Sequence, residues 1–144
     1  MIEISTIEGE DEALEQRLQG MLDTHAERNG TAFDPQTVGF VARDGDGAFL
    51  GGLYDRGQLG WFFIKLLALE ARARQTGVGG RLLAEAEAHA RASGLIGVFL
   101  DTYEFEAPGF YAKLGYKEFG RLPPVGGHPQ RMWFAKTFGV EETN

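Results

Sequence analysis

The sequence contains no cysteine among its 144 residues. Disulfide bonds, thiolate-bound metals and a cysteine nucleophile are therefore excluded. A chain of this size buries enough apolar surface to fold without such links. Long apolar runs are also missing, since none approaches the ~20 residues that span a bilayer. The first residues, Met1–Ile4, carry neither the basic flank nor the apolar core of a signal peptide. We expect a soluble, cytoplasmic protein with no membrane partner.

Positive charge is scarce as well. The chain has 14 Lys and Arg against 21 Asp and Glu, which gives a formal net charge of -7. Proteins that bind the phosphate backbone use clustered Lys and Arg, so the composition argues against nucleic acid as a partner. An acidic surface favours a cationic substrate, but it also serves solubility alone.

The pattern of apolar residues predicts one α/β domain over residues 1–144. Helical spacing predicts helices over residues 11–28, 77–93 and 108–114. Short apolar runs predict strands over residues 38–43, 48–55, 59–69, 95–100, 116–122 and 131–138. Asp44–Gly47 and Asp55–Gly57 have the composition of turns. This order predicts a mixed β-sheet flanked by helices.

The run over residues 59–69 is apolar on both alternating faces, and Lys65 is its only charge. This pattern predicts a central strand that other elements cover on both sides. Four aromatic side chains on this strand and on the last one are expected in the core, namely Trp61, Phe63, Trp133 and Phe134.

The most informative segment is Arg74–Gly80, Arg-Gln-Thr-Gly-Val-Gly-Gly, between the central strand and the second helix. The first N–H groups of a helix have no partner within it, the dipole there is positive, and small residues let an anion come close. Arg72, Arg74 and Arg81 add positive charge in an otherwise acidic protein. Together these features predict a pyrophosphate site. A glycine-rich loop that only turns the chain is the alternative for this segment taken alone.

Two common phosphate motifs do not fit this segment. A dinucleotide fingerprint counted from Gly77 requires glycine where Leu82 stands. A P-loop requires lysine after its last glycine, and Gly80 is followed by Arg81.

The pattern Arg74-x-x-Gly77-x-Gly79 resembles motif A of the GNAT acetyltransferases. Leu66–Glu70 resembles the central strand of that family, and Phe110–Tyr116 resembles its motif B. The three stretches follow the order and usual spacing of the family, and the resemblance covers roughly Val38–Phe138. It implies a GNAT-like mixed sheet with a splayed central strand pair. It also implies an N-acetyltransferase that moves an acetyl group from acetyl-coenzyme A to a primary amine by direct attack in a ternary complex.

The resemblance further implies where acetyl-coenzyme A binds as co-substrate. In the family the pantetheine arm pairs with the central strand, where that strand splays from its neighbour, and the pyrophosphate lies on the N–H groups of the loop. The neighbour here is the strand over residues 95–100. The residues assigned to the coenzyme are Leu67, Ala68, Leu69, Arg74, Gln75, Thr76, Gly77, Val78, Gly79 and Gly80.

Tyr111 is the candidate general acid, because motif B of the family carries a tyrosine beside the sulfur of the coenzyme. A phenol with a pKa near ~10 stays protonated at neutral pH and can donate to a departing thiolate. The alternative is a core tyrosine that packs with Phe110. The donor to the developing oxyanion is expected to be a backbone N–H near Ala68 or Leu69.

The general base is left open among Asp101, Glu104, Glu106, His128 and a chain of waters. The three carboxylates stand at or just past the end of a buried strand, where sites usually form. Position 104 is also a departure, because the family often has asparagine three residues before the motif B alanine, here Ala107.

Three hypotheses remain for the chain as a whole. The first is a catalytic amine acetyltransferase, and the second is a module that binds acetyl-coenzyme A without transferring the acetyl group. The third is an unrelated α/β nucleotide binder, which would have to explain why motif B is also present. The acceptor is a small-molecule amine or a protein amine, and a homodimer is compatible with the sequence. No metal is expected, because His25, His89 and His128 are far apart and form no local metal motif.

Overall fold

The computed structural model describes residues 1–139, and the chain divides into two compact units with the boundary after Asp34. The first unit contains helix α1, Glu12–Arg28, close to the predicted range. The carboxylate of Asp11 accepts a hydrogen bond from the N–H of Leu14 at 2.9 Å and caps the helix. No residue of α1 is buried. The domain expected over residues 1–144 also includes 140–144, which lie outside the described residues.

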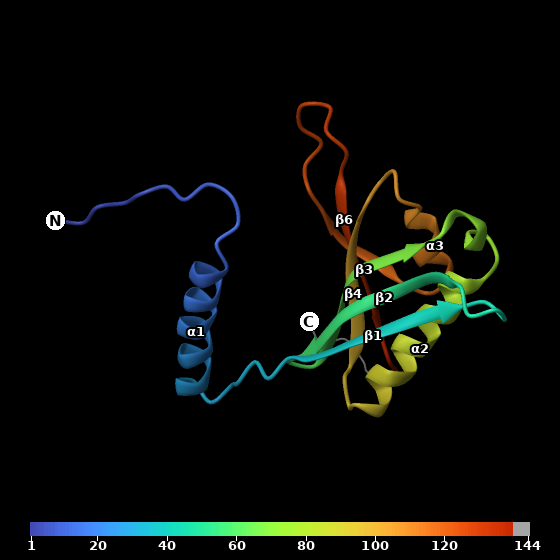
Figure 1. The fold of residues 1–144 in the computed structure, drawn as a ribbon, viewed down its shortest axis with the longest axis horizontal. Helices are drawn as coiled ribbons and strands as arrows, with labels where there is room; N and C mark the ends of the chain where they lie inside the picture. The colour runs from blue at the N-terminus through green and yellow to red at the C-terminus, as the bar shows by residue number, and fades with distance from the viewer. Residues whose placement is uncertain (140–144) are drawn as a thin grey trace. The chain divides into compact units, whose positions relative to one another are not determined.

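The second unit is a six-stranded mixed sheet with the order β1-β2-β3-β4-β6-β5 (Figure 1). Only the β3–β4 pair is parallel within the described residues. The strands are β1 Gln36–Arg43, β2 Phe49–Gln58, β3 Trp61–Leu69, β4 Gly97–Tyr103, β5 Lys117–Arg121 and β6 Arg131–Thr137. The helices are the 3-10 turn Ala71–Ala73, α2 Val78–Ala92 and α3 Pro108–Lys113. The predicted mixed sheet flanked by helices is confirmed.

Helix α2 covers one face of the sheet, which we call the inner face (Figure 1). The apolar stripe of α2 is buried against four neighbouring strands. The buried cluster is Leu53, Phe62, Ile64, Leu82, Leu83, Ala86, Ala90, Val98, Leu100, Tyr116, Met132 and Phe134. The small residues Ala86 and Ala90 are fully buried and let the helix lie close to the sheet.

The parallel pairing of β3 with β4 runs from Trp61 and Gly97 to Ile64 and Leu100, where it ends. At the same point the β2–β3 ladder shifts register, so that Lys65 is the extra residue of a bulge. Past the bulge, the remaining residues of β3 pair only with β2, and Asp101–Tyr103 pair only with β6, within residues 1–139. The splayed central strand pair that the resemblance implied is therefore present.

The turn predicted at Asp55–Gly57 is wrong. These residues continue β2 in register with β1 and β3, and the chain turns at Leu59 and Gly60, both at positive φ. Residues typical of a turn lie within a strand here, and the side chain of Asp55 points inward and is buried. Its Oδ2 has no hydrogen-bond partner among the described residues.

The expectation that β3 is covered on both sides is not met within residues 35–139. The outer face of the sheet has no helix in this unit, and Leu66 is 59% exposed there. Of the four aromatics expected in the core, only Phe134 is fully buried, whereas Trp61, Phe63 and Trp133 are half-buried on the outer face. An apolar strand therefore does not by itself show how many of its faces are covered.

Gly97 tests the packing at the start of the β3–β4 pair. A Cβ placed there meets the carbonyl oxygen of Lys136 at 2.5 Å and the ring of Trp61 at 2.6 Å. Gly97→Ala should lower the free energy of unfolding by roughly 1–3 kcal/mol in urea denaturation. Gly120→Ala, on β5 with nothing within 4 Å, is the control. Equal stability of the two variants would contradict this packing.

Candidate functional site

The segment Arg74–Gly80 forms a row of unpaired backbone donors. Gly77 is the N-cap of α2 at φ 88°, Gln75 also has positive φ, and the first helical hydrogen bond runs from Arg81 to Gly77. None of the N–H groups from Gln75 to Gly80 makes a hydrogen bond within residues 1–139. The Thr76 hydroxyl donates to the carbonyl of Ala73 and fixes the loop. The donor row expected for an anion is therefore present.

The three arginines near this row are not equivalent. Arg72 forms an ion pair with Asp44 at 3.0 Å. The pKa of Asp44 lies below its usual value, first because the N–H of Ala48 donates to its carboxylate and then because of Arg72. Arg74 and Arg81 make no ion pair in the described part of the chain. The positive charge available to an anion therefore comes from two side chains rather than three.

The glycines of this segment have different surroundings. A Cβ on Gly79 meets the Phe110 ring at 3.0 Å and Leu69 at 3.5 Å, so Gly79 lets α2 pack on α3 and β3. A Cβ on Gly80 meets nothing within 4 Å. A larger side chain at Gly79 would therefore disturb the packing of the core as well as any bound anion. Gly80 is the position where a side chain alters the site alone.

The exposed edge of β3 supplies further backbone groups. The N–H of Glu70 donates to Leu50 of β2 at 2.7 Å. Because peptide groups alternate along a strand, those of Leu67 and Leu69 point away from β2, into the splay. The peptide groups of Ala68 point toward β2, where Ala68 pairs with Gly52. Leu67 and Leu69 are thus the two residues, of the three predicted, with backbone groups free to pair with a ligand.

Tyr111 differs from its neighbour Tyr116 in one respect that matters for chemistry. The Tyr116 hydroxyl donates to Glu87 at 3.2 Å, and Lys136 pairs with the same carboxylate at 2.7 Å. Burial, with Glu87, raises the pKa of Tyr116 far above its usual value. The Tyr111 hydroxyl has no such partner within residues 1–139.

The Tyr111 ring is half-buried on α3, against Phe110, Tyr116 and Phe134. Burial first, and then the charges of Glu106 and Asp101, raise the pKa of Tyr111 to about 12. The phenol is therefore fully protonated at neutral pH, with a proton that is not committed to another side chain.

The three candidate carboxylates fall into different surroundings. Asp101 is half-buried and bound by Arg131, Glu106 is exposed and accepts from Thr102 at 3.4 Å, and Glu104 is exposed and acts electrostatically on Arg121. Only Asp101 and Glu106 act on Tyr111. The grip of Arg131 on Asp101 was missed by sequence reasoning, because the two lie thirty residues apart and no local pattern joins them.

The histidines take no part in this arrangement. His89 packs edge-on against Phe40 and Phe62, His25 lies on the exposed surface of α1, and His128 is exposed in the loop before β6. No group of three or more metal-ligating side chains occurs within residues 1–139. No described helix is long and apolar enough to cross a membrane.

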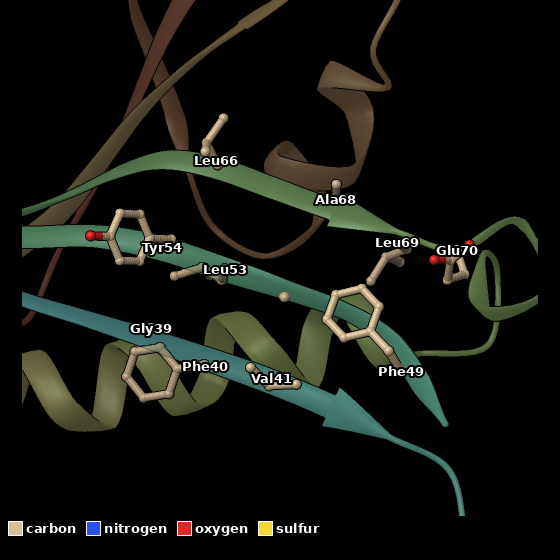
Figure 2. Close-up of a pocket in the computed structure, with 11 residues that line it drawn as sticks. Gly39, Phe40, Val41, Phe49, Leu53, Tyr54, Leu66, Ala68, Leu69 and Glu70 are labelled. Carbon is tan, nitrogen blue, oxygen red and sulfur yellow. The ribbon is translucent and has the colours of Figure 1, made fainter. Parts of the chain in front are cut away.

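A separate apolar hollow of about 360 Å³ lies over β1, β2 and β3 (Figure 2). Tyr54, Leu66, Phe49 and Val41 contribute exposed apolar surface to it. The hollow shares Ala68 and Leu69 with the end of β3 but lies on the far side of that strand from β4. It is therefore distinct from the splay.

Comparisons with known proteins agree with this geometry. The model of the acetyltransferase (GNAT) domain matches residues 34–118, more than half of the chain. The chain is 44% identical over 78 residues to the blasticidin-S acetyltransferase of Streptomyces morookaense, which is 54% of this chain and 57% of that protein. It is 30% identical over 105 residues to acetyltransferase Atu2258 of Agrobacterium fabrum, covering 73% and 77% of the two chains.

Solved structures share the fold. A protein assigned as an acetyltransferase from Agrobacterium tumefaciens superposes with a TM-score of 0.82 and 27% identity, over 96% of this chain and 100% of that one. A protein assigned as a streptothricin acetyltransferase from Bacillus anthracis, solved with acetyl-coenzyme A, has a TM-score of 0.65 and 21% identity over 76% and 67%. The second likeness concerns the fold alone.

The raised pKa of Tyr111 has a consequence for stability. The unfolded chain releases this proton near pH 10, whereas the folded protein holds it to about pH 12, so stability falls as pH rises through this window. In Tyr111→Phe, the loss of unfolding free energy between about pH 9 and pH 11 should shrink by up to about 1 kcal/mol. Urea denaturation at both pH values measures it. The exposed Tyr54→Phe is the control, and equal losses in the two variants would contradict the burial of the phenol.

Proposed function

The chain belongs to the GNAT acetyltransferase family, and on this basis we propose that it transfers an acetyl group from acetyl-coenzyme A to a primary amine by direct attack in a ternary complex. The observation that carries the proposal is the combination of three features along one path: the donor row from Gln75 to Gly80, the free β3 edge at Leu67 and Leu69, and the protonated Tyr111 beside the end of β4.

The donor row suits the pyrophosphate of the coenzyme. Six backbone N–H groups, which have no partner among residues 1–139, lie at the positive end of α2 beside Arg74 and offer hydrogen bonds and charge to an anion. Gly77 and Gly80 leave open space above these groups. The remaining predicted residues, Thr76, Val78 and Gly79, would contribute backbone groups, since Gly79 packs on Phe110 and the Thr76 hydroxyl is bonded within the loop.

The β3 edge suits an extended amide-bearing arm. Leu67 and Leu69 would pair their peptide groups with it, as an added strand pairs with a sheet edge. The same N–H groups are candidates to stabilise the negative charge that develops on the thioester oxygen, a role that backbone donors fill when they are held rigidly in place. The β2–β3 ladder holds them so on one side.

Tyr111 would serve as the general acid. Its phenol keeps its proton throughout the physiological range and can pass it to the sulfur as the thiolate departs. The acceptor amine must lose a proton before or during attack, because an alkylammonium ion has no lone pair. Asp101, Glu106 or water would receive that proton.

The acceptor is proposed only as a class. The relative that is named a blasticidin-S acetyltransferase, and the structural neighbour named a streptothricin acetyltransferase, make small-molecule amines the first class to test. Protein amines are the second class. The alternative function is a module that binds acetyl-coenzyme A without turnover.

An amine panel tests the function directly. The panel contains blasticidin S, a streptothricin, an aminoglycoside, spermidine and a lysine peptide, and the assay follows free thiol released from acetyl-coenzyme A. Acetylated product from at least one amine supports the proposal. Tight coenzyme binding with no product from any amine would favour the binding module instead.

Gly80 tests coenzyme binding without disturbing the core. Gly80→Glu places a carboxylate over the donor row, and a negative residue in the first turn of a helix favours folding. We expect loss of acetyl-coenzyme A affinity of about a hundredfold or more by calorimetry, since like-charge contact costs several kcal/mol. Gly80→Ala, which adds only a methyl group in open space, is the matched control. Unchanged affinity in Gly80→Glu would remove the donor row from the site.

Tyr111→Phe tests the general acid. The ring still packs, and only the proton donor is lost, so kcat should fall by roughly 10² to 10⁴ with little change in coenzyme affinity. Single-turnover rates must accompany the steady state, because slow product release would hide a slower chemical step. Full kcat and an unchanged single-turnover rate would exclude Tyr111 as the acid. Tyr116→Phe, which loses a hydrogen bond in the core, is expected to lower stability by about 1 kcal/mol while turnover persists.

A further inference from the structure

Asp101 stands at the narrow end of the splay. It follows Leu100, the last residue of β4 that pairs with β3. Leu100 and Thr102 on either side are buried on the inner face, so Asp101 points to the outer face, and its side chain is 19% exposed. The matching residue of β3, the first one past the segment that pairs with β4, is Lys65.

Arg131 holds Asp101 through one oxygen only. Its Nε and Nη2 lie 3.0 and 2.9 Å from Oδ1 of Asp101, and its Cζ lies 5.2 Å from the centre of the Trp133 ring. Both Arg131 and Trp133 are on β6, which pairs with β4 at this point. Oδ2 of Asp101 makes no hydrogen bond within residues 1–139. The carboxylate is thus fixed in orientation, with one oxygen available.

The neighbouring carboxylates are poorer candidates for the same role. Glu104 acts on Arg121 of β5, and it does not act on Tyr111. Glu106 acts on Tyr111, but its side chain is exposed and is held only by a 3.4 Å contact from Thr102. Asp101 combines partial burial, a fixed orientation and an electrostatic effect on the candidate general acid.

We propose that Oδ2 of Asp101 binds the protonated amine of the acceptor at the narrow end of the splay, and that Arg131 is the positioning residue that holds the carboxylate for it. This inference rests on the proposed function and narrows the acceptor class to amines that are cationic at neutral pH. Arg131 stays bound to Oδ1 and neutralises part of the charge of Asp101. Oδ2 is still available to accept a hydrogen bond from an ammonium ion. An anionic acceptor is repelled less by the Asp101–Arg131 pair than by an unpaired carboxylate. Selectivity for a cationic acceptor therefore depends on the hydrogen bond that the ammonium group donates to Oδ2.

Asp101→Asn tests the contact with an isosteric side chain. It removes the charge and keeps the shape, so KM for each accepted amine of the panel should rise about tenfold to a hundredfold, the range of a charged hydrogen bond. Acetyl-coenzyme A affinity should stay within about twofold, because Asp101 lies outside the donor row. Glu118→Gln, an equal loss of charge on β5, is the control and should leave KM unchanged.

Arg131 separates a positioning role from simple charge removal. Arg131→Gln should raise KM for the amine several-fold while coenzyme affinity holds, and Arg131→Lys, which keeps the charge but loses the two-donor grip, should fall between wild type and Arg131→Gln. A role in stability alone would instead lower the melting temperature and leave KM as in the wild type. These variants also serve if Asp101→Asn fails to fold.

The outcomes distinguish failure of the Asp101 proposal from failure of the proposed function. If the wild type acetylates at least one amine and KM is unchanged in both Asp101→Asn and Arg131→Gln, the Asp101 proposal is overturned and the proposed function stands. The proposal is also overturned if the best acceptor carries no positive charge. If the wild type acetylates no amine while binding acetyl-coenzyme A, the proposed function itself fails.

Discussion

The parting of β3 from β4 after Ile64 and Leu100 is the constraint on which the rest of the structure depends. A parallel pair of strands satisfies its backbone groups mutually, so an edge inside a sheet exists only where that pairing is broken. In this sheet the β3–β4 pairing ends at Ile64, immediately before the bulge of the β2–β3 ladder at Lys65. A single irregularity therefore frees the peptide groups of Leu67 and Leu69 and leaves Asp101 as the first residue of β4 past the paired segment. The core below is not interrupted, because α2 closes the inner face with small residues such as Ala86.

Charge is distributed along this path in a definite order. The loop before α2 offers unpaired N–H groups and the free guanidinium of Arg74, whereas the end of β4 offers carboxylates and the neutral phenol of Tyr111. The protein as a whole is acidic, with a net charge of -7, so the positive end of α2 is a local exception to the general field. An anion is thus favoured at the start of α2, and a cation at the end of β4. This polarity suits a reaction between two substrates of opposite charge.

Much of the fold could be predicted from the sequence, and particular residues show where prediction stopped. Helix α2 was predicted nearly residue by residue, because its apolar stripe and the glycine at its start are local signals. The turn at Asp55–Gly57 was wrong, because composition cannot reveal that Asp55 is paired on both sides within a sheet. The coverage of β3 was overestimated, since the apolar outer face of Trp61 and Phe63 is not covered within its own unit.

The site divides in the same way. The donor row from Gln75 to Gly80 and the position of Tyr111 follow from contiguous motifs, so the sequence was sufficient to point to both. The distinction between Gly79 and Gly80 could not be predicted, because it depends on the ring of Phe110 on α3, which lies 31 residues further along the chain. The pairing of Asp101 with Arg131 was not accessible either, because it is created by the β4–β6 register. The candidate functional groups are predicted by contiguous motifs, whereas the contacts that orient them depend on which strands and helices pack together.

The bulge at Lys65 also determines which face of the sheet the later residues of β3 occupy. Phe62 and Ile64 before the bulge, and Leu67 and Leu69 after it, all reach the core side, although a regular strand would alternate them onto opposite faces. Lys65 itself is exposed, so its identity is weakly constrained, but its presence sets the phase of every residue that follows. Removing Lys65 would restore an uninterrupted ladder with both leucines still on the core side, whereas exchanging it for another residue would keep the bulge. The length of β3, rather than the identity of Lys65, therefore maintains the irregularity at the point where β3 parts from β4.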